Sequence, residues 1–206
     1  MAIPIFNQLA EKKAIEQTMA SLKSNGINAF LYDSEEEAKN KILELVPSGS
    51  EVMEMTSVTL DSLGIGQLLR DSKKYVLIKD KLNALDRAKD HRKIQQIGAA
   101  PQITIGSVHA VTQDGKVFIA SATGSQLPAY VYGADKVIWV VGTQKIVKDA
   151  DEAMKRIYEY TLPLESERAK KAYGVEGSFV SKLLMIHKEF TLDRITLIFV
   201  NKNLGF

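Results

Sequence analysis

The chain has 206 residues, of which 45% are hydrophobic and 25% charged, the composition of an ordinary globular protein. It contains no cysteine, which excludes disulfides, thiolate metal ligands and a cysteine nucleophile. The net charge is +2, from 27 basic and 25 acidic side chains, and the densest basic run, residues 87–93, is interrupted by an acid, so we expect no nucleic-acid partner. With no signal-peptide pattern and no apolar run of membrane-spanning length, we expect a cytoplasmic location and no membrane partner.

Hydrophobic spacing predicts alternating helices and strands in the first half of the chain. Apolar residues that recur every three or four positions indicate helices, and short apolar runs between turn residues indicate strands. Helices are predicted over residues 7–23, within an N-terminal region 1–27, and from the capping box at Ser34 to Pro47. Two more are predicted around residues 57–68 and over 84–97. The predicted strands are 28–32, 51–55 and a short one at 75–78.

The second half continues the alternation. Strands are predicted at 103–112 and 116–121, joined by a hairpin turn at Asp114–Gly115. A polar loop at 123–126 and a short helix ended by Gly133 follow, and then the nearly continuous apolar run 136–141, which is typical of a strand buried on both faces. A helix from Asp149 and a last strand at 195–200 complete the pattern, and residues 161–194 are expected to form a loose excursion.

This order of elements favours one α/β domain over residues 1–206, a three-layer α/β/α sandwich with a mixed, mainly parallel sheet. The aromatic residues Trp139, Tyr130, Tyr132 and Tyr158 are expected to fill the core or an interface. A homodimer is the expected assembly, because cyclic dimers are the commonest oligomers.

The familiar catalytic motifs are absent from the sequence. The three histidines lack the spacing of a helical zinc site, so no metal is predicted. The segment from Gly64 to Gly66 lacks the third glycine of a dinucleotide fingerprint, and no Walker A or Gly-x-Ser-x-Gly sequence occurs. These absences disfavour a nucleotide-binding protein and a serine hydrolase, and no cofactor can be named.

Two polar loops, each after a strand and before a helix, predict one anion-binding cavity. The alternative is that their Ser and Thr residues only cap helices. The expected ligand-binding residues are Thr56, Ser57, Ser107, Thr123, Gly124, Ser125, Gln126 and Lys145. The expected catalytic residues are His109 as the proton carrier and Glu54 as a base, against the alternatives of a structural histidine and an exposed acid. For Lys145 the alternative is a solvated lysine, which is the commoner case after a strand.

Three stretches carry a family resemblance. They are Val46–Val52 with Ser57–Ile65, the region Ile103–Val147 with its ending Val-Gly-Thr-Gln-Lys-Ile-Val, and the closing Leu197–Phe206. In this order and spacing they resemble the LUD (lactate utilization) domain family, formerly domain of unknown function 162. The resemblance implies a fold of the NagB/RpiA/CoA-transferase group and an association with lactate oxidation alongside iron–sulfur partner subunits.

The chain departs from the family at two places. Glu54-Met55-Thr56-Ser57 stands where many members carry a glycine-rich loop, and Thr112-Gln113 replaces the usual acidic residue. The implied function is lactate or hydroxy-acid utilization with a small anionic metabolite as ligand. Two alternatives stay open: a non-catalytic assembly subunit of an iron–sulfur lactate-oxidising complex, and a sugar-phosphate isomerase-like enzyme.

Overall fold

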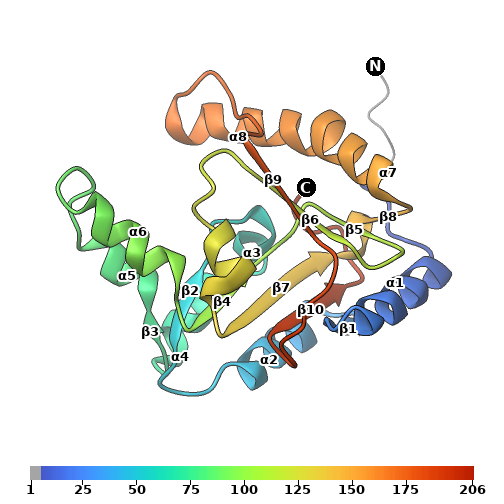
Figure 1. The fold of residues 1–206 in the computed structure, drawn as a ribbon, viewed down its shortest axis with the longest axis horizontal. Helices are drawn as coiled ribbons and strands as arrows, with labels where there is room; N and C mark the ends of the chain where they lie inside the picture. The colour runs from blue at the N-terminus through green and yellow to red at the C-terminus, as the bar shows by residue number, and fades with distance from the viewer. Residues whose placement is uncertain (1–5) are drawn as a thin grey trace.

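The computed structural model describes residues 6–206, and its helices and strands alternate along the chain (Figure 1). The α-helices are α1 (Lys12–Ser24), α2 (Glu35–Leu45), α3 (Val58–Ser62), α4 (Ile65–Ser72), α5 (Ile78–Asn83), α6 (His91–Ala99), α7 (Ala150–Lys155) and α8 (Leu162–Tyr173). Two π-helical turns, η1 (Ala129–Gly133) and η3 (Arg156–Thr161), and a 3₁₀ turn, η2 (Thr143–Lys145), complete the helical elements. The strands are β1 (Asn28–Tyr32), β2 (Glu51–Glu54), β3 (Val76–Leu77), β4 (Ile103–Gly106), β5 (Ala110–Thr112), β6 (Val117–Ser121), β7 (Lys136–Gly142), β8 (Ile146–Val147), β9 (Lys182–Ile186) and β10 (Ile195–Val200).

Six strands form an all-parallel sheet in the order β1-β10-β7-β4-β2-β3. The apolar run predicted as a central strand is β7, which pairs with β10 on one side and β4 on the other. Its residues Ile138 and Val140 are 2% and 0% exposed, so the predicted strand, buried on both faces, is confirmed.

Successive side chains of β7 point to opposite faces of the sheet and pack into two different cores. Ile138 and Val140 pack with α2, α3 and α4, which cover one face of the sheet. Trp139 points to the opposite face and joins a core with α1, η1 and residues of β5 and β6. The sheet is therefore flanked by helices, as the α/β/α prediction requires, and Trp139 packs edge-on against Tyr130 at 5.4 Å between ring centroids.

The antiparallel hairpin belongs to a second sheet, in the order β8-β5-β6-β9. The strand predicted over 103–112 is therefore two strands: β4 lies in the parallel sheet and β5 in the second sheet, with a break at Ser107–His109. The second sheet packs Ala110, Phe118 and Ala120 against Ala153 and Ile157 of the α7–η3 segment. The antiparallel character is thus separated from the main sheet.

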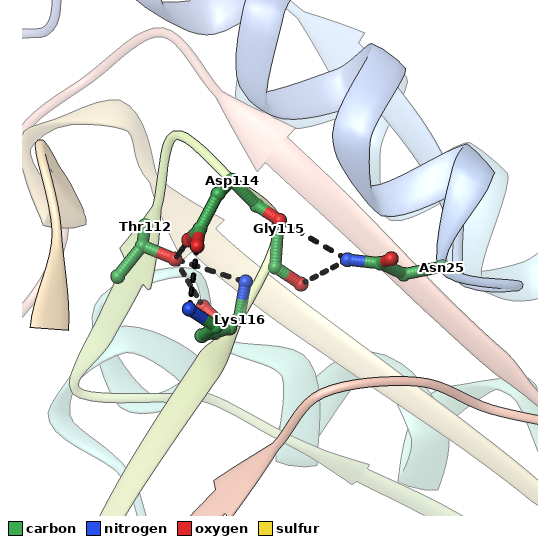
Figure 2. A network of polar contacts seen from close by, with 5 residues as sticks. All are labelled: Asn25, Thr112, Asp114, Gly115 and Lys116. Atoms are coloured by element: carbon green, nitrogen blue, oxygen red, sulfur yellow. Dashed lines mark hydrogen bonds and ion pairs between the residues drawn. The ribbon is translucent and has the colours of Figure 1, made fainter.

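The hairpin turn is fastened to α1 (Figure 2). The side-chain amide of Asn25, at the end of α1, donates to the carbonyl oxygens of Asp114 and Gly115 at 3.1 and 3.2 Å. Within the turn, the backbone N–H of Lys116 donates to Thr112 Oγ1 at 2.9 Å, and the Lys116 ammonium pairs with Asp114 at 2.6 Å. Gly115 has φ +80°, a conformation that L side chains rarely adopt.

Several predicted boundaries need correction. The N-terminal helix begins at Lys12 and not at residue 7, and the helix expected over 84–97 begins only at His91, as α6, because residues 84–90 connect it to α5. The excursion expected over 161–194 contains α8 and β9. Tyr132 and Tyr158 are 90% and 45% exposed, so neither fills the core, and their place at an interface stays a prediction. The part of the expected region 1–27 that covers residues 1–5 lies outside the described residues.

Candidate functional site

A cavity of about 290 Å³ lies at the carboxyl ends of β2, β4 and β7. Parallel α/β sheets bind ligands at this edge, because the loops that follow neighbouring strands converge there. Glu54 ends β2, Ser107 follows β4, and Lys145 ends the 3₁₀ turn after β7; all three line the cavity. The second sheet and η3–α8 supply the other walls, through residues such as Ala120, Ile157 and Thr161.

Eight of the ten expected site residues line this cavity. They are Glu54, Thr56, Ser57, Ser107, His109, Ser125, Gln126 and Lys145. Thr123 and Gly124 are not among the described residues that line it. A Cβ at Gly124 would lie 2.5 Å from Cδ of Lys182, so this glycine faces the β9 side chain and gives a ligand no close backbone approach.

Lys145 is buried, not solvated: it is only 2% exposed. Its Nζ atom donates to Thr59 Oγ1 at 2.9 Å, to Ser107 Oγ at 3.2 Å and to the carbonyl oxygen of Val108 at 3.2 Å. Burial, and then the charge of Arg156, hold the pKa of this amine well below its ordinary value. The neutral amine is therefore much easier to form here than in water.

Arg156 is a second buried cation, 0% exposed, on the π-helical turn η3. Its NH1 group donates to the carbonyl oxygen of His109 at 2.6 Å and to Thr161 Oγ1 at 3.1 Å. Burial lowers its pKa to about 10, which leaves the guanidinium charged at neutral pH. The Nε and NH2 groups find no hydrogen-bond partner among the described residues.

Lys145 and Arg156 both donate hydrogen bonds to the backbone at the break between β4 and β5. The carbonyl oxygens of Val108 and His109 lie where the chain leaves one sheet for the other, and Lys145 and Arg156 each bond one of them. Buried carbonyl groups need such partners. The backbone connection at the floor of the cavity is thus held by two positive side chains.

His109 is half-buried and its Nδ1 atom accepts the backbone N–H of Ala120 at 3.1 Å. Burial first, and then the charges of Lys145 and Arg156, lower its pKa to about 3. A proton on Nδ1 would also point at the N–H of Ala120 and replace this hydrogen bond by a repulsion. The titration near neutral pH that made His109 the expected proton carrier therefore does not hold, and its catalytic role stays a prediction.

Glu54 is 6% exposed, so it is not the exposed strand-end acid of the alternative interpretation. Its Oε2 atom forms an ion pair with Lys79 of α5 at 3.0 Å. The backbone of α4 also approaches the carboxylate, because a Cβ at Gly66 would lie 2.8 Å from Oε2. At the cavity wall, Lys79 thus balances the charge of Glu54.

Sequence reasoning missed part of the site. Thr59, Lys79, Thr161, Glu165 and Arg168 also line the cavity, and Arg156 lies behind it. Thr59 belongs to the recognised loop, residues 54–59, but was not chosen among its ligand-binding residues. Arg156 left no local signal, because a single arginine in a helical stretch has the pattern of a surface residue.

Two further features bear on ligand class. No cluster of three or more His, Asp or Glu residues that could hold a metal ion occurs in residues 6–206. Over the same residues, no helix combines the length and the apolar character that crossing a membrane requires.

Comparison with known proteins identifies a family model. The model of the LUD domain matches residues 15–182. Among solved structures, the chain resembles a DUF162 family protein from Deinococcus radiodurans, with a TM-score of 0.56, 13% identity, and coverage of 94% of this chain and 100% of that chain. A structure of eIF2B delta from Chaetomium thermophilum matches more weakly, with a TM-score of 0.36 and 12% identity over 70% of this chain and 57% of that one. No curated protein matches the sequence.

Proposed function

We infer a function from one premise: this chain belongs to the LUD domain family. It is therefore a domain protein of a family associated with lactate utilization. Within that role, we propose that it binds a small anionic metabolite, such as a hydroxy-acid, in the cavity at the ends of β2, β4 and β7. The family supplies the metabolic context, and the electrostatics of the cavity supply the ligand class.

The observation that carries this proposal is a pair of buried basic side chains without an acidic partner: Arg156 is charged, and Lys145 becomes charged when an anion lies beside it. Among residues 6–206, neither Lys145 nor Arg156 has a carboxylate within 4.0 Å, and residues 1–5 contain no acidic side chain. Burying an unpaired charge costs several kcal/mol, and a bound anion offsets that cost.

The size and lining of the cavity support a small ligand. Its volume of about 290 Å³ lies at the lower end of small-molecule sites. Hydroxyl groups from Thr56, Ser57, Ser107 and Ser125 line it beside Lys145. Such groups complete the hydrogen bonds of a carboxylate and of a neighbouring hydroxyl group.

Calorimetric titration with L-lactate, pyruvate and inorganic phosphate tests the proposal. The wild type is expected to bind at least one of these anions, and Lys145→Met is expected to weaken binding about tenfold or more, because the substitution removes a positive charge that attracts the anion in a poorly solvated site. Lys23→Met is the matched control, since Lys23 is exposed at the end of α1 and its loss removes the same charge.

Proton linkage gives the titration a second readout. An anion beside Lys145 favours its charged form, so binding near or above the lowered pKa takes up a proton and its heat depends on the ionisation enthalpy of the buffer. Equal affinities of the wild type and Lys145→Met would contradict the proposal, as would binding of none of the three anions.

A second candidate function, the assembly subunit, is favoured by a different observation. Exposed apolar side chains gather on residues 173–192, where Phe179, Phe190 and Leu192 are 63%, 93% and 88% exposed. Large apolar side chains that stay exposed are typical of docking sites when they form one surface. Because the chain has no cysteine, any iron–sulfur cluster of such a complex would be bound by the partner through its own thiolates.

A further inference from the structure

The groups around Lys145 determine which of its hydrogen bonds the amine donates and which it accepts. Thr59 Oγ1 donates its own proton to the carbonyl oxygen of Leu204 at 3.1 Å, so toward Lys145 it acts as an acceptor. The carbonyl oxygen of Val108 has no proton and is an acceptor as well. Two N–H bonds of the lysine are therefore committed to Thr59 and Val108.

The third neighbour of Nζ is the hydroxyl group of Ser107, at 3.2 Å. A neutral amine has two N–H bonds and one lone pair, so with both N–H bonds committed the lone pair faces Ser107. The serine proton then donates to Nζ. When the lysine is charged, Ser107 accepts its third N–H bond, and the serine proton turns to Thr59 Oγ1 at 3.3 Å. The serine hydroxyl thus has an acceptor in either state.

Ser107 is also the member of this cluster that a ligand reaches. Lys145 and Thr59 are 2% and 1% exposed, whereas Ser107 is half-buried on the cavity wall. Its backbone is held firmly, because a Cβ at the preceding Gly106 would lie 2.8 Å from Cζ of the buried Tyr130. Because three partners surround Nζ, the amine is poorly placed to attack a ligand itself.

We propose that Ser107 is a nucleophile for acyl transfer and that Lys145 is its general base, acting on esters or thioesters of small carboxylic acids. Serine–lysine pairs provide this chemistry because the amine accepts the proton that the hydroxyl loses. Lowering of the lysine pKa by burial and by Arg156 supports the assignment, since a base must be deprotonated to act. The inference goes beyond anion binding and does not depend on it.

The proposed reaction balances without a cofactor. Ser107 Oγ forms a bond to the carbonyl carbon while its proton moves to Lys145 Nζ. The bond from that carbon to the leaving oxygen or sulfur then breaks, and the leaving group takes the proton from Nζ. Water attacks the acyl-serine, one of its protons passes through Nζ to Ser107 Oγ, and the carboxylic acid that is released loses its proton to the solvent.

A fluorophosphonate probe tests the assignment, because it phosphonylates activated serines through the same attack. Intact-protein and peptide mass spectrometry are expected to find one adduct, on Ser107, and none in Ser107→Ala. In Lys145→Met the labelling rate is expected to fall on the order of 100-fold, the lower range for loss of a general base. Ser62→Ala, which removes an exposed serine outside the cavity, is expected to label like the wild type.

The wild type provides a test that does not depend on the folding of a variant. Its labelling rate is expected to rise with pH and to level off once Lys145 is deprotonated, below the ordinary pKa of a lysine. Three results would overturn the proposal: no labelling of the folded wild type, an adduct that persists in Ser107→Ala, or a rate that does not change with pH. Anion binding without labelling would leave the proposed function standing and remove this inference alone.

Discussion

His109 accepts the backbone N–H of Ala120 through Nδ1 at 3.1 Å, and this bond ties the β4–β5 break to β6. The imidazole can accept this bond only while Nδ1 carries no proton. Burial and the two neighbouring cations act in the same direction and lower its pKa from 6.5 to about 3.

This lowered pKa predicts a destabilisation in acid. Between pH 6.5 and about 3 the unfolded chain binds a proton at His109 that the folded chain does not, so the free energy of unfolding falls as the pH falls through this window. His109→Asn keeps an acceptor near the position of Nδ1 but cannot titrate, and its unfolding free energy is expected to fall less over the same window. Urea unfolding followed by the fluorescence of Trp139, the single tryptophan, measures both.

The control for that experiment is His91→Asn, which removes an exposed histidine. It is expected to show the same pH dependence as the wild type. If His109→Asn and the wild type lose stability in parallel below pH 6.5, His109 is not held neutral by its surroundings.

Lys145→Met is expected to separate stability from ligand binding. Methionine fills a similar volume without a charge, so the desolvation of the amine disappears, while Val108 loses one hydrogen bond. Burying an unpaired amine costs stability, so its removal offsets the hydrogen bond that the carbonyl group of Val108 loses. We therefore expect the free energy of unfolding at neutral pH to stay equal or to rise by about 1 kcal/mol, as measured in urea. A loss of more than about 2 kcal/mol would instead mark the lysine as mainly structural.

The parts of the fold that were predicted correctly depend on local patterns. Five consecutive apolar residues predict the strand β7, and the Asp-Gly turn predicts the hairpin. The loops after β2 and β6 were assigned to one site on the expectation that both follow strands of one sheet. Both loops do line the cavity, but β6 belongs to the second sheet, so the two sheets and not one sheet edge bring the loops together. Thr123 and Gly124 fall outside the cavity because that loop turns toward Lys182 of β9, a strand that was not predicted.

The burial of the two basic side chains of the site, Lys145 and Arg156, could not be predicted from local patterns. A lysine after a strand has the same sequence signature whether it is solvated or buried, and Lys145 is buried because η2 directs it beneath the break after β4. That break was itself hidden, since Ile103–Thr112 has the composition of one uninterrupted strand. The burial of Arg156 likewise depends on contacts distant in sequence, such as its bond to His109.

The exposed apolar segment predicts self-association. β9 forms one edge of the second sheet, and its residues Leu183 and Met185 are 39% and 40% exposed. Phe190 and Leu192 follow, at 93% and 88% exposed. Light scattering at micromolar concentration is expected to find a homodimer for the wild type and a monomer for the double variant Phe190→Ser, Leu192→Ser.

Tyr132→Ser is the control for the association experiment, because Tyr132 is 90% exposed but lies in η1, outside this segment. It is expected to remain dimeric. A monomeric wild type would end the prediction of a homodimer and leave the apolar segment to another partner.

Gly115 and Gly49 offer a matched pair that separates backbone strain from a packing clash. Both have positive φ, +80° and +85°, so alanine costs about 1 kcal/mol of backbone strain at either site. At Gly49 a Cβ meets nothing within 4 Å, whereas at Gly115 it would lie 2.8 Å from the backbone carbon of Ser21 and 2.9 Å from the nitrogen of Leu22. The α1 backbone cannot yield without disturbing Leu22, which is fully buried. Urea unfolding is expected to show a loss of about 1 kcal/mol for Gly49→Ala and about 2–4 kcal/mol for Gly115→Ala, the excess being the cost of overpacking. Equal losses would mean that α1 and the hairpin turn of Figure 2 are not packed together as tightly as their hydrogen bonds indicate.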